Sequence, residues 1–190
     1  MFDAWIDESG SNQQADPGAY ILSAAICERV HADATREAMR GLLVSRGHRK
    51  LHWRDEDRSR QQTIAAVIAN LRVEHLVVVR SGAAATDRPE RQRRLCMERL
   101  LPELVALGVG EATVESRGRG DDMRDRQTLD HLRRKHALRG RLNLNHVGGP
   151  AEPMLWIADA CCGAVTQLRC GDTARYALIE PKVTMLEIRS

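Results

Sequence analysis

Two apolar segments separated by a polar turn open the chain, and they constrain its fold more than any other feature. Residues 2–6 are short and apolar and stop at two acids and Gly10. Residues 10–18 are rich in turn-forming side chains, and the apolar residues 19–27 follow them. Two strand-like segments joined by such a turn predict an antiparallel hairpin.

Helix-like and strand-like segments alternate after this hairpin. Apolar residues recur at helical spacing in residues 33–45, 57–71, 89–107 and 153–168, whereas residues 73–80, 112–116 and 142–147 have strand patterns. Pro102 predicts a kink in the third helix or its division into two helices. Residues 117–122 predict a Gly-rich loop before a polar helix that ends near residue 138, and residues 176–188 leave room for one more strand. This order predicts one α/β domain, residues 1–190, around a mixed sheet.

Composition excludes several classes of protein. With 43% apolar and 29% charged residues the chain is not expected to be disordered, and no apolar run approaches the roughly 20 residues that span a membrane. The N-terminus carries acids where a signal peptide has basic residues. An odd number of cysteines, five, without a CxxC pair favours buried core thiols over disulfides or zinc. We therefore expect a cytoplasmic protein without a membrane partner. The oligomeric state stays open, a homodimer included.

Three acidic positions interrupt otherwise buried patterns. Asp7 and Glu8 end the first predicted strand, Glu115 ends the strand at residues 112–116, and Asp159 lies within the apolar helix segment MLWIADACCGAV. A buried carboxylate is costly unless it is paired, protonated or bound to a metal. Singly, each acid has a bland explanation, as a turn cap, a surface residue or the partner of a distant Arg. Together they predict acids from two strand ends and a core helix meeting at one edge of a sheet.

A carboxylate cluster without coordinating His or Cys suits Mg²⁺ or Mn²⁺. Two such ions can activate water and stabilise the leaving oxygen when a phosphodiester is cleaved. The chain has a net charge of only +3, but 26 of its 29 basic residues are Arg, which binds phosphate in a bidentate manner. Arg49, Arg54, Arg117 and Arg119 are candidates for holding flanking phosphates. Aromatic residues make up 3%, which argues against a base-stacking platform.

Four motifs carry a resemblance to a known family. They are WIDESGS followed by AYILSAAIC, then LHWRD at residues 51–55, TVESRGRGDD, and LWIADACCGAV. In this order they resemble the bacterial domain-of-unknown-function family 3800, which is known by its DESG signature and is similar to the ribonuclease H-like superfamily. The resemblance covers residues 2–165. It implies a ribonuclease H-like three-layer α/β fold, a mixed β-sheet with helices on both faces.

The resemblance also implies roles for single residues. Asp7, Glu115 and Asp159 correspond to the first, second and third metal ligands, whereas Glu8 is a lesser candidate because adjacent strand residues face opposite ways. Nucleases of the superfamily often carry a further acid on the first helix after the hairpin. Here that helix offers Asp33 and Glu37, and neither is assigned as the fourth ligand.

His52, in the motif KLHWRD, is a candidate to contact substrate phosphate or to shuttle a proton, and the alternative is a partly buried loop histidine. The leading hypothesis is a metal-dependent nuclease acting on RNA or DNA, with Asp7, Glu8, His52, Glu115 and Asp159 as catalytic candidates. The alternative is a catalytically silent module on the same fold that binds nucleic acid or protein. A phosphatase for small phosphate esters is a weaker third hypothesis, because no nucleophile motif is present.

Overall fold

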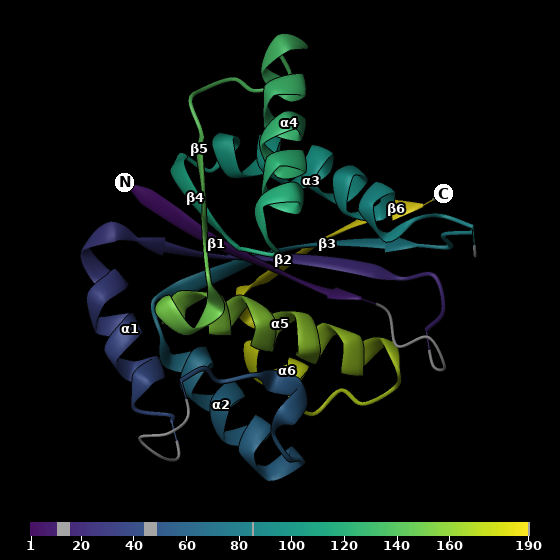
Figure 1. Cartoon of the computed structure of the whole chain (residues 1–190). Helices are drawn as coiled ribbons and strands as arrows, with labels where there is room; N and C mark the ends of the chain where they lie inside the picture. The colour runs from purple at the N-terminus through teal and green to yellow at the C-terminus, as the bar shows by residue number, and fades with distance from the viewer. Residues whose placement is uncertain (11–15, 44–48, 85, 190) are drawn as a thin grey trace.

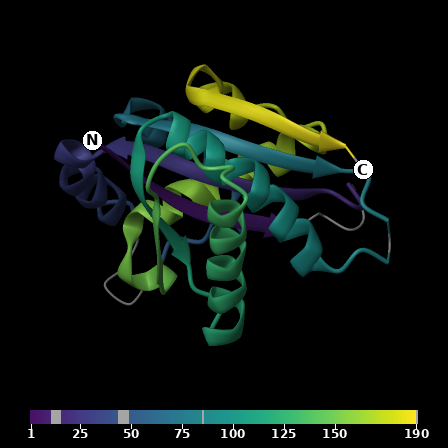
Figure 2. The same cartoon turned by 90° about the horizontal axis from the view of Figure 1, so that it is seen from above.

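A six-stranded mixed sheet forms the centre of the molecule, with strand order β5-β4-β1-β2-β3-β6. The structure, a computed structural model, describes residues 1–10, 16–43, 49–84 and 86–189, so the predicted turn at residues 10–18 lies partly outside it. The strands are β1 (Phe2–Gly10), β2 (Tyr20–Glu28), β3 (Val73–Ser81), β4 (Val109–Glu115), β5 (Asn143–Val147) and β6 (Val183–Arg189). β1, β2 and β3 pair in antiparallel order, while β4, β5 and β6 join in parallel pairings. Figure 2 shows β6 along one edge of the sheet, beside β3.

Helices cover both faces of the sheet, which confirms the predicted three-layer α/β architecture (Figure 1). One face carries α3 (Pro89–Ala106) and α4 (Arg119–Arg134), and the other carries α1 (Ala32–Arg40), α2 (Arg58–Asn70), α5 (Pro153–Arg169) and α6 (Tyr176–Ile179). Two apolar cores result, one on each side of the sheet. Along β1 the side chains alternate between them: Trp5 lies in the core beneath α5 and Ile6 in the core beneath α3. None of the described helices is long and apolar enough to cross a membrane.

β1 is longer than the sequence predicts. The strand does not end at the acids but continues to Gly10, so Asp7 pairs with Ser23 and Glu8 with Leu22 inside the antiparallel ladder. Backbone hydrogen bonding to the buried strand β2 outweighs the poor strand preference of these polar residues. The acids therefore sit on a rigid strand and not on a turn.

The helix that contains Pro102 also differs from the prediction. α3 runs as one helix from Pro89 to Ala106, so a division into two helices is wrong. Leu100, Leu101 and Leu104 are fully buried around the proline, and their packing against the sheet compensates for the backbone hydrogen bond that proline removes. Similarly, α4 begins at Arg119 and ends at Arg134, which makes Arg119 the first residue of a helix and not part of a loop.

Gly163 of α5 brings a distant loop onto the helix. A Cβ atom at this position would lie 2.0 Å from Cδ1 and 2.6 Å from Cγ of the Trp53 side chain. Trp53 is buried, at 4% exposure, so its indole has no room to move away. The absence of a side chain at Gly163 is what lets residues 53–55, a short 3-10 helix, dock against α5.

Gly163→Ala is therefore expected to destabilise the protein by about 1–3 kcal/mol, because overpacking against a buried ring outweighs the better helix propensity of alanine. Urea denaturation followed by circular dichroism measures the change. Gly120→Ala in α4 is the matched control, because a Cβ there meets nothing within 4 Å. Equal stability of the two variants would contradict the role of Gly163.

Candidate active site

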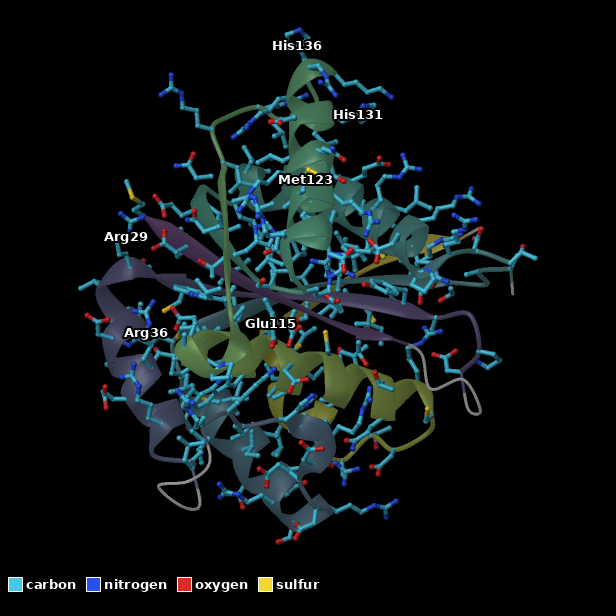
Figure 3. All side chains as sticks on the ribbon, in the orientation of Figure 1. Arg29, Arg36, Glu115, Met123, His131 and His136 are labelled. Atoms are coloured by element: carbon cyan, nitrogen blue, oxygen red, sulfur yellow. The ribbon has the colours of Figure 1, made fainter. Side chains whose placement is uncertain are left out.

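β1 and β4 carry two of the predicted acids to the same place. The strands are parallel neighbours in which Ile6 pairs with Val114, and one residue further along lie Asp7 and Glu115. Parallel strands in register present matching residues on the same face, and here that face is covered by α5. Figure 3 labels Glu115, which lies near the centre of the molecule between the sheet and α5.

α5 carries the third acid against the same strands. Cys162 of α5 contacts the backbone carbonyl of Asp7 through its thiol at 3.4 Å, and Asp159 precedes it by three residues on the same helix face. The Oδ2 atom of Asp159 accepts a hydrogen bond of 2.9 Å from the backbone N–H of Trp53 and lies 3.1 Å from Nδ1 of His52. The motif predicted around His52 is therefore held directly on this carboxylate.

Most of the predicted site residues line one open pocket of about 240 Å³. Its lining comprises Asp7, Glu8, Lys50, His52, Arg54, Glu115, Ser116, Arg117 and Asp159. Arg119 and Arg49 are not among them; both are exposed elsewhere. Residues from β1, β4, α5 and the segment before α2 thus meet at one position, as the acids in the sequence predict.

Asp7 is buried next to other carboxylates, at 7% exposure. Burial, reinforced by the charges of Asp159 and Glu115, raises the pKa of Asp7 from 3.8 to about 9. For His52, by contrast, the hydrogen bond to Asp159 raises the pKa above its usual 6.5. Without an additional cation the pocket therefore favours a protonated Asp7 at neutral pH.

Lys50 is a site residue that the sequence analysis did not predict. Its Nζ atom donates to both carboxylate oxygens of Glu115, at 2.7 and 2.8 Å. Burial lowers the pKa of Lys50, but the hydrogen bonding and charge of Glu115 outweigh burial and raise it overall. The signal in the sequence was its place next to the LHWRD motif in a chain with only three lysines.

A buried ion-pair network lies behind the pocket, on the opposite face of the sheet. Arg93, 1% exposed, donates two hydrogen bonds of 2.9 and 2.8 Å to Asp125 and also pairs with Glu8. Burial alone would raise the pKa of Asp125, yet hydrogen bonds from Arg93 and His146 lower it to about 2. Arg117 lies 3.3 Å from Glu8. Glu8 therefore points away from Asp7, as strand alternation predicts, and its catalytic role remains a prediction.

The first helix after the hairpin adds no acid to the pocket. Asp33 on α1 is 98% exposed in its side chain and pairs with Arg36, and Glu37, 71% exposed, pairs with Arg40. Neither therefore serves as a further ligand in this arrangement.

The donors in the pocket suit a hard cation by their chemistry. Within the described ranges, no three or more His, Cys, Asp and Glu side chains are arranged to hold a metal ion as they stand. Glu115 is engaged by Lys50, which leaves the carboxylates of Asp7 and Asp159. Their oxygens are the ligands that Mg²⁺ and Mn²⁺ prefer, and a cation would relieve the repulsion that raises the pKa of Asp7.

Comparison with solved structures identifies the fold. The chain is similar to the PCNA:RNase HII complex from Archaeoglobus fulgidus, with a TM-score of 0.56 and 16% identity over 90% of this chain and 75% of that one. It is similar to ribonuclease H2 from Pyrococcus horikoshii OT3, with a TM-score of 0.53 and 14% identity over 95% of this chain and 78% of that one. It is also similar to Bst-RNase HIII in complex with Mn²⁺, with a TM-score of 0.54 and 16% identity over 95% of this chain and 52% of that one. The fold is ribonuclease H-like.

No family model and no curated protein matches the chain. The resemblance to the DESG-signature family therefore stays a prediction, and identities of 14–16% support the fold alone.

The raised pKa of Asp7 predicts how stability depends on pH. Between 3.8 and about 9 the folded protein keeps Asp7 protonated while the unfolded chain ionises it. This contribution to stability is therefore complete below pH 4 and falls as pH rises toward 9, by at most about 1.4 kcal/mol per pH unit.

Asp7→Asn is expected to remove that part of the slope and to be more stable than wild type at pH 8. Urea denaturation at pH 5, 7 and 8.5 without divalent cations measures both proteins. Asp33→Asn, at an exposed position, should keep the wild-type slope. An unchanged slope in Asp7→Asn would show that Asp7 is not the group responsible.

Proposed function

We propose that this chain is a metal-dependent nuclease that hydrolyses phosphodiester bonds in RNA or DNA. The observation that carries the proposal is the meeting of Asp7, Glu115 and Asp159 in one pocket, with Arg54 and Arg117 in its lining. The ribonuclease H-like fold and the resemblance to the DESG-signature family support the same reading. The substrate-binding assignment now rests on Arg54 and Arg117, because Arg119 lies outside the pocket.

Asp7 and Asp159 are the residues that would hold Mg²⁺ or Mn²⁺. When bound, such an ion supplies Lewis-acid polarisation of a phosphoryl oxygen and lowers the pKa of water. It also makes the pocket attractive to phosphate, which the carboxylates alone would repel. Binding requires an ionised Asp7, so the protein should release a proton as it takes up the ion at neutral pH.

The remaining residues bind and orient substrate. Arg117 is partly buried and held among Glu8 and Glu90, so its guanidinium is positioned before substrate arrives. A positioned Arg binds phosphate at low entropic cost. His52 is 45% exposed in its side chain while Asp159 orients its ring, which suits it to donate a hydrogen bond to a phosphate oxygen or to carry a proton.

Cleavage of labelled RNA, DNA and RNA–DNA hybrids with Mg²⁺ or Mn²⁺ tests the proposal. Asp7→Asn and Asp159→Asn are each expected to lower the rate by more than about 100-fold, because removing a ligand should cost more than removing a residue that supports one. Asp130→Asn, on an exposed part of α4, is the control and should cleave like wild type.

Two results would overturn the proposal. One is the absence of metal-dependent cleavage on every substrate, and the other is equal cleavage by wild type and both carboxylate variants. Salt-dependent binding of nucleic acid without cleavage, unchanged in the variants, would instead favour the catalytically silent binding module.

A further inference from the structure

Lys50 is a charged residue of the pocket to which the proposed chemistry gives no role. Its ammonium group bridges both oxygens of Glu115, and the charges of Asp7 and Asp159 also act on it. The side chains of Lys50 and Glu115 are 19% and 21% exposed. A contact that is bidentate and mostly shielded from water differs from the flexible ion pairs of protein surfaces.

The backbone is shaped to admit this ion pair. A Cβ atom on Gly149 would lie 2.4 Å from Oε1 of Glu115 and 2.8 Å from Nζ of Lys50, so a side chain there would have to displace the ends of both. The carbonyl of Gly149 accepts a hydrogen bond of 2.8 Å from the indole of Trp156, a buried residue of α5. The glycine is thus held in place, and the Lys50–Glu115 pair packs closely against it.

The type of cation is also informative. Of the 29 basic residues only Lys50, Lys135 and Lys182 are lysines. Arginine presents a broad planar fork, whereas the lysine ammonium is a compact point charge with three donors. Among side chains an ammonium is therefore the closest equivalent of a small metal cation, and this Arg-rich chain has one where carboxylates gather.

Charge balance sets how many metal ions the pocket accommodates. Asp7, Glu115 and Asp159 supply three negative charges when ionised, and Lys50 neutralises one of them. Glu8 acts on Asp7 less than Asp159 and Glu115 do, because it points to the other face of the sheet and pairs with Arg93 and Arg117. The carboxylates of Asp7 and Asp159 remain, and the other lining side chains Arg54, Arg117 and His52 add no negative charge, so one divalent cation is enough to balance the pocket.

We propose that the Lys50 ammonium permanently occupies one cation position of this carboxylate cluster, so that the site takes a single divalent cation, held by Asp7 and Asp159. This inference rests on the proposed function and specifies its metal centre. Lys50 is a positioning residue: it keeps Glu115 compensated and out of the metal's coordination sphere, and the second ion of a two-metal centre has no place.

Titration with Mn²⁺ at pH 8, followed by electron paramagnetic resonance of the free ion, measures how many ions bind per chain. The wild type is expected to bind one. Lys50→Met removes the charge at similar length and frees Glu115, so it should bind two. Lys50→Arg keeps a positive charge and should bind one, and Lys135→Met, at an exposed position, should match wild type.

Lysine reactivity in the unmodified protein gives a second readout that needs no variant. Lys50 should resist acylation by an amine reagent both with and without Mn²⁺, while exposed Lys135 reacts in both conditions. Peptide mass spectrometry identifies the modified lysine. If Mn²⁺ makes Lys50 reactive, the metal displaces it and the inference is wrong.

The outcomes separate this inference from the proposed function. Binding of no ion by the wild type would overturn the metal-dependent function itself. Binding of two ions by the wild type, or of one ion by a folded Lys50→Met, would overturn only the role of Lys50.

Discussion

The rest of the site depends on the contacts of the Asp159 carboxylate with Trp53 and His52. One of its oxygens accepts the backbone N–H of Trp53 and faces His52, so a single side chain on α5 holds the residues around 52–53 against the helix. That segment also supplies Lys50 and Arg54 to the pocket. Burying a carboxylate costs free energy unless it has hydrogen-bond partners. This cost therefore favours the arrangement in which Trp53 and His52 meet Asp159, and in which Lys50 and Arg54 reach the pocket.

The same arrangement leaves Asp7 without enough partners. It accepts the backbone N–H of Glu8 at 2.8 Å, but the nearby charges of Asp159 and Glu115 are of its own sign. Such a group lowers the stability of the fold when it is ionised, and groups with perturbed pKa values of this kind cluster at functional sites. This arrangement is consistent with the proposed binding of a divalent cation, and Lys50 supplies only part of the positive charge that the carboxylates lack.

Much of this could be predicted from sequence because burial patterns are local. Asp7, Glu115 and Asp159 stand out since each interrupts an apolar run, and the alternation of segments predicts an α/β sheet. Lys50 and the Arg93–Asp125 pair could not be predicted in the same way. Their partners lie 65 and 32 residues away, and only the folded chain brings them together. The end of β1 differs from the prediction for a related reason: pairing with β2 is a tertiary effect that overrides local polarity.

The ion pair between Arg93 and Glu8 has a consequence for how β1 finds its place. Asp7 and Glu8 are adjacent acids on opposite faces of one strand, and a slip by one residue would exchange them. Such a slip would bring Glu8 into the pocket and aim Asp7, which is one methylene shorter, at a guanidinium already committed to Asp125. It would also drive Trp5 into the tightly packed layer beneath α3 and α4. The buried Arg93 therefore helps to fix the register of β1: it binds Glu8 on its own side of the sheet and leaves Asp7 on the side of the pocket.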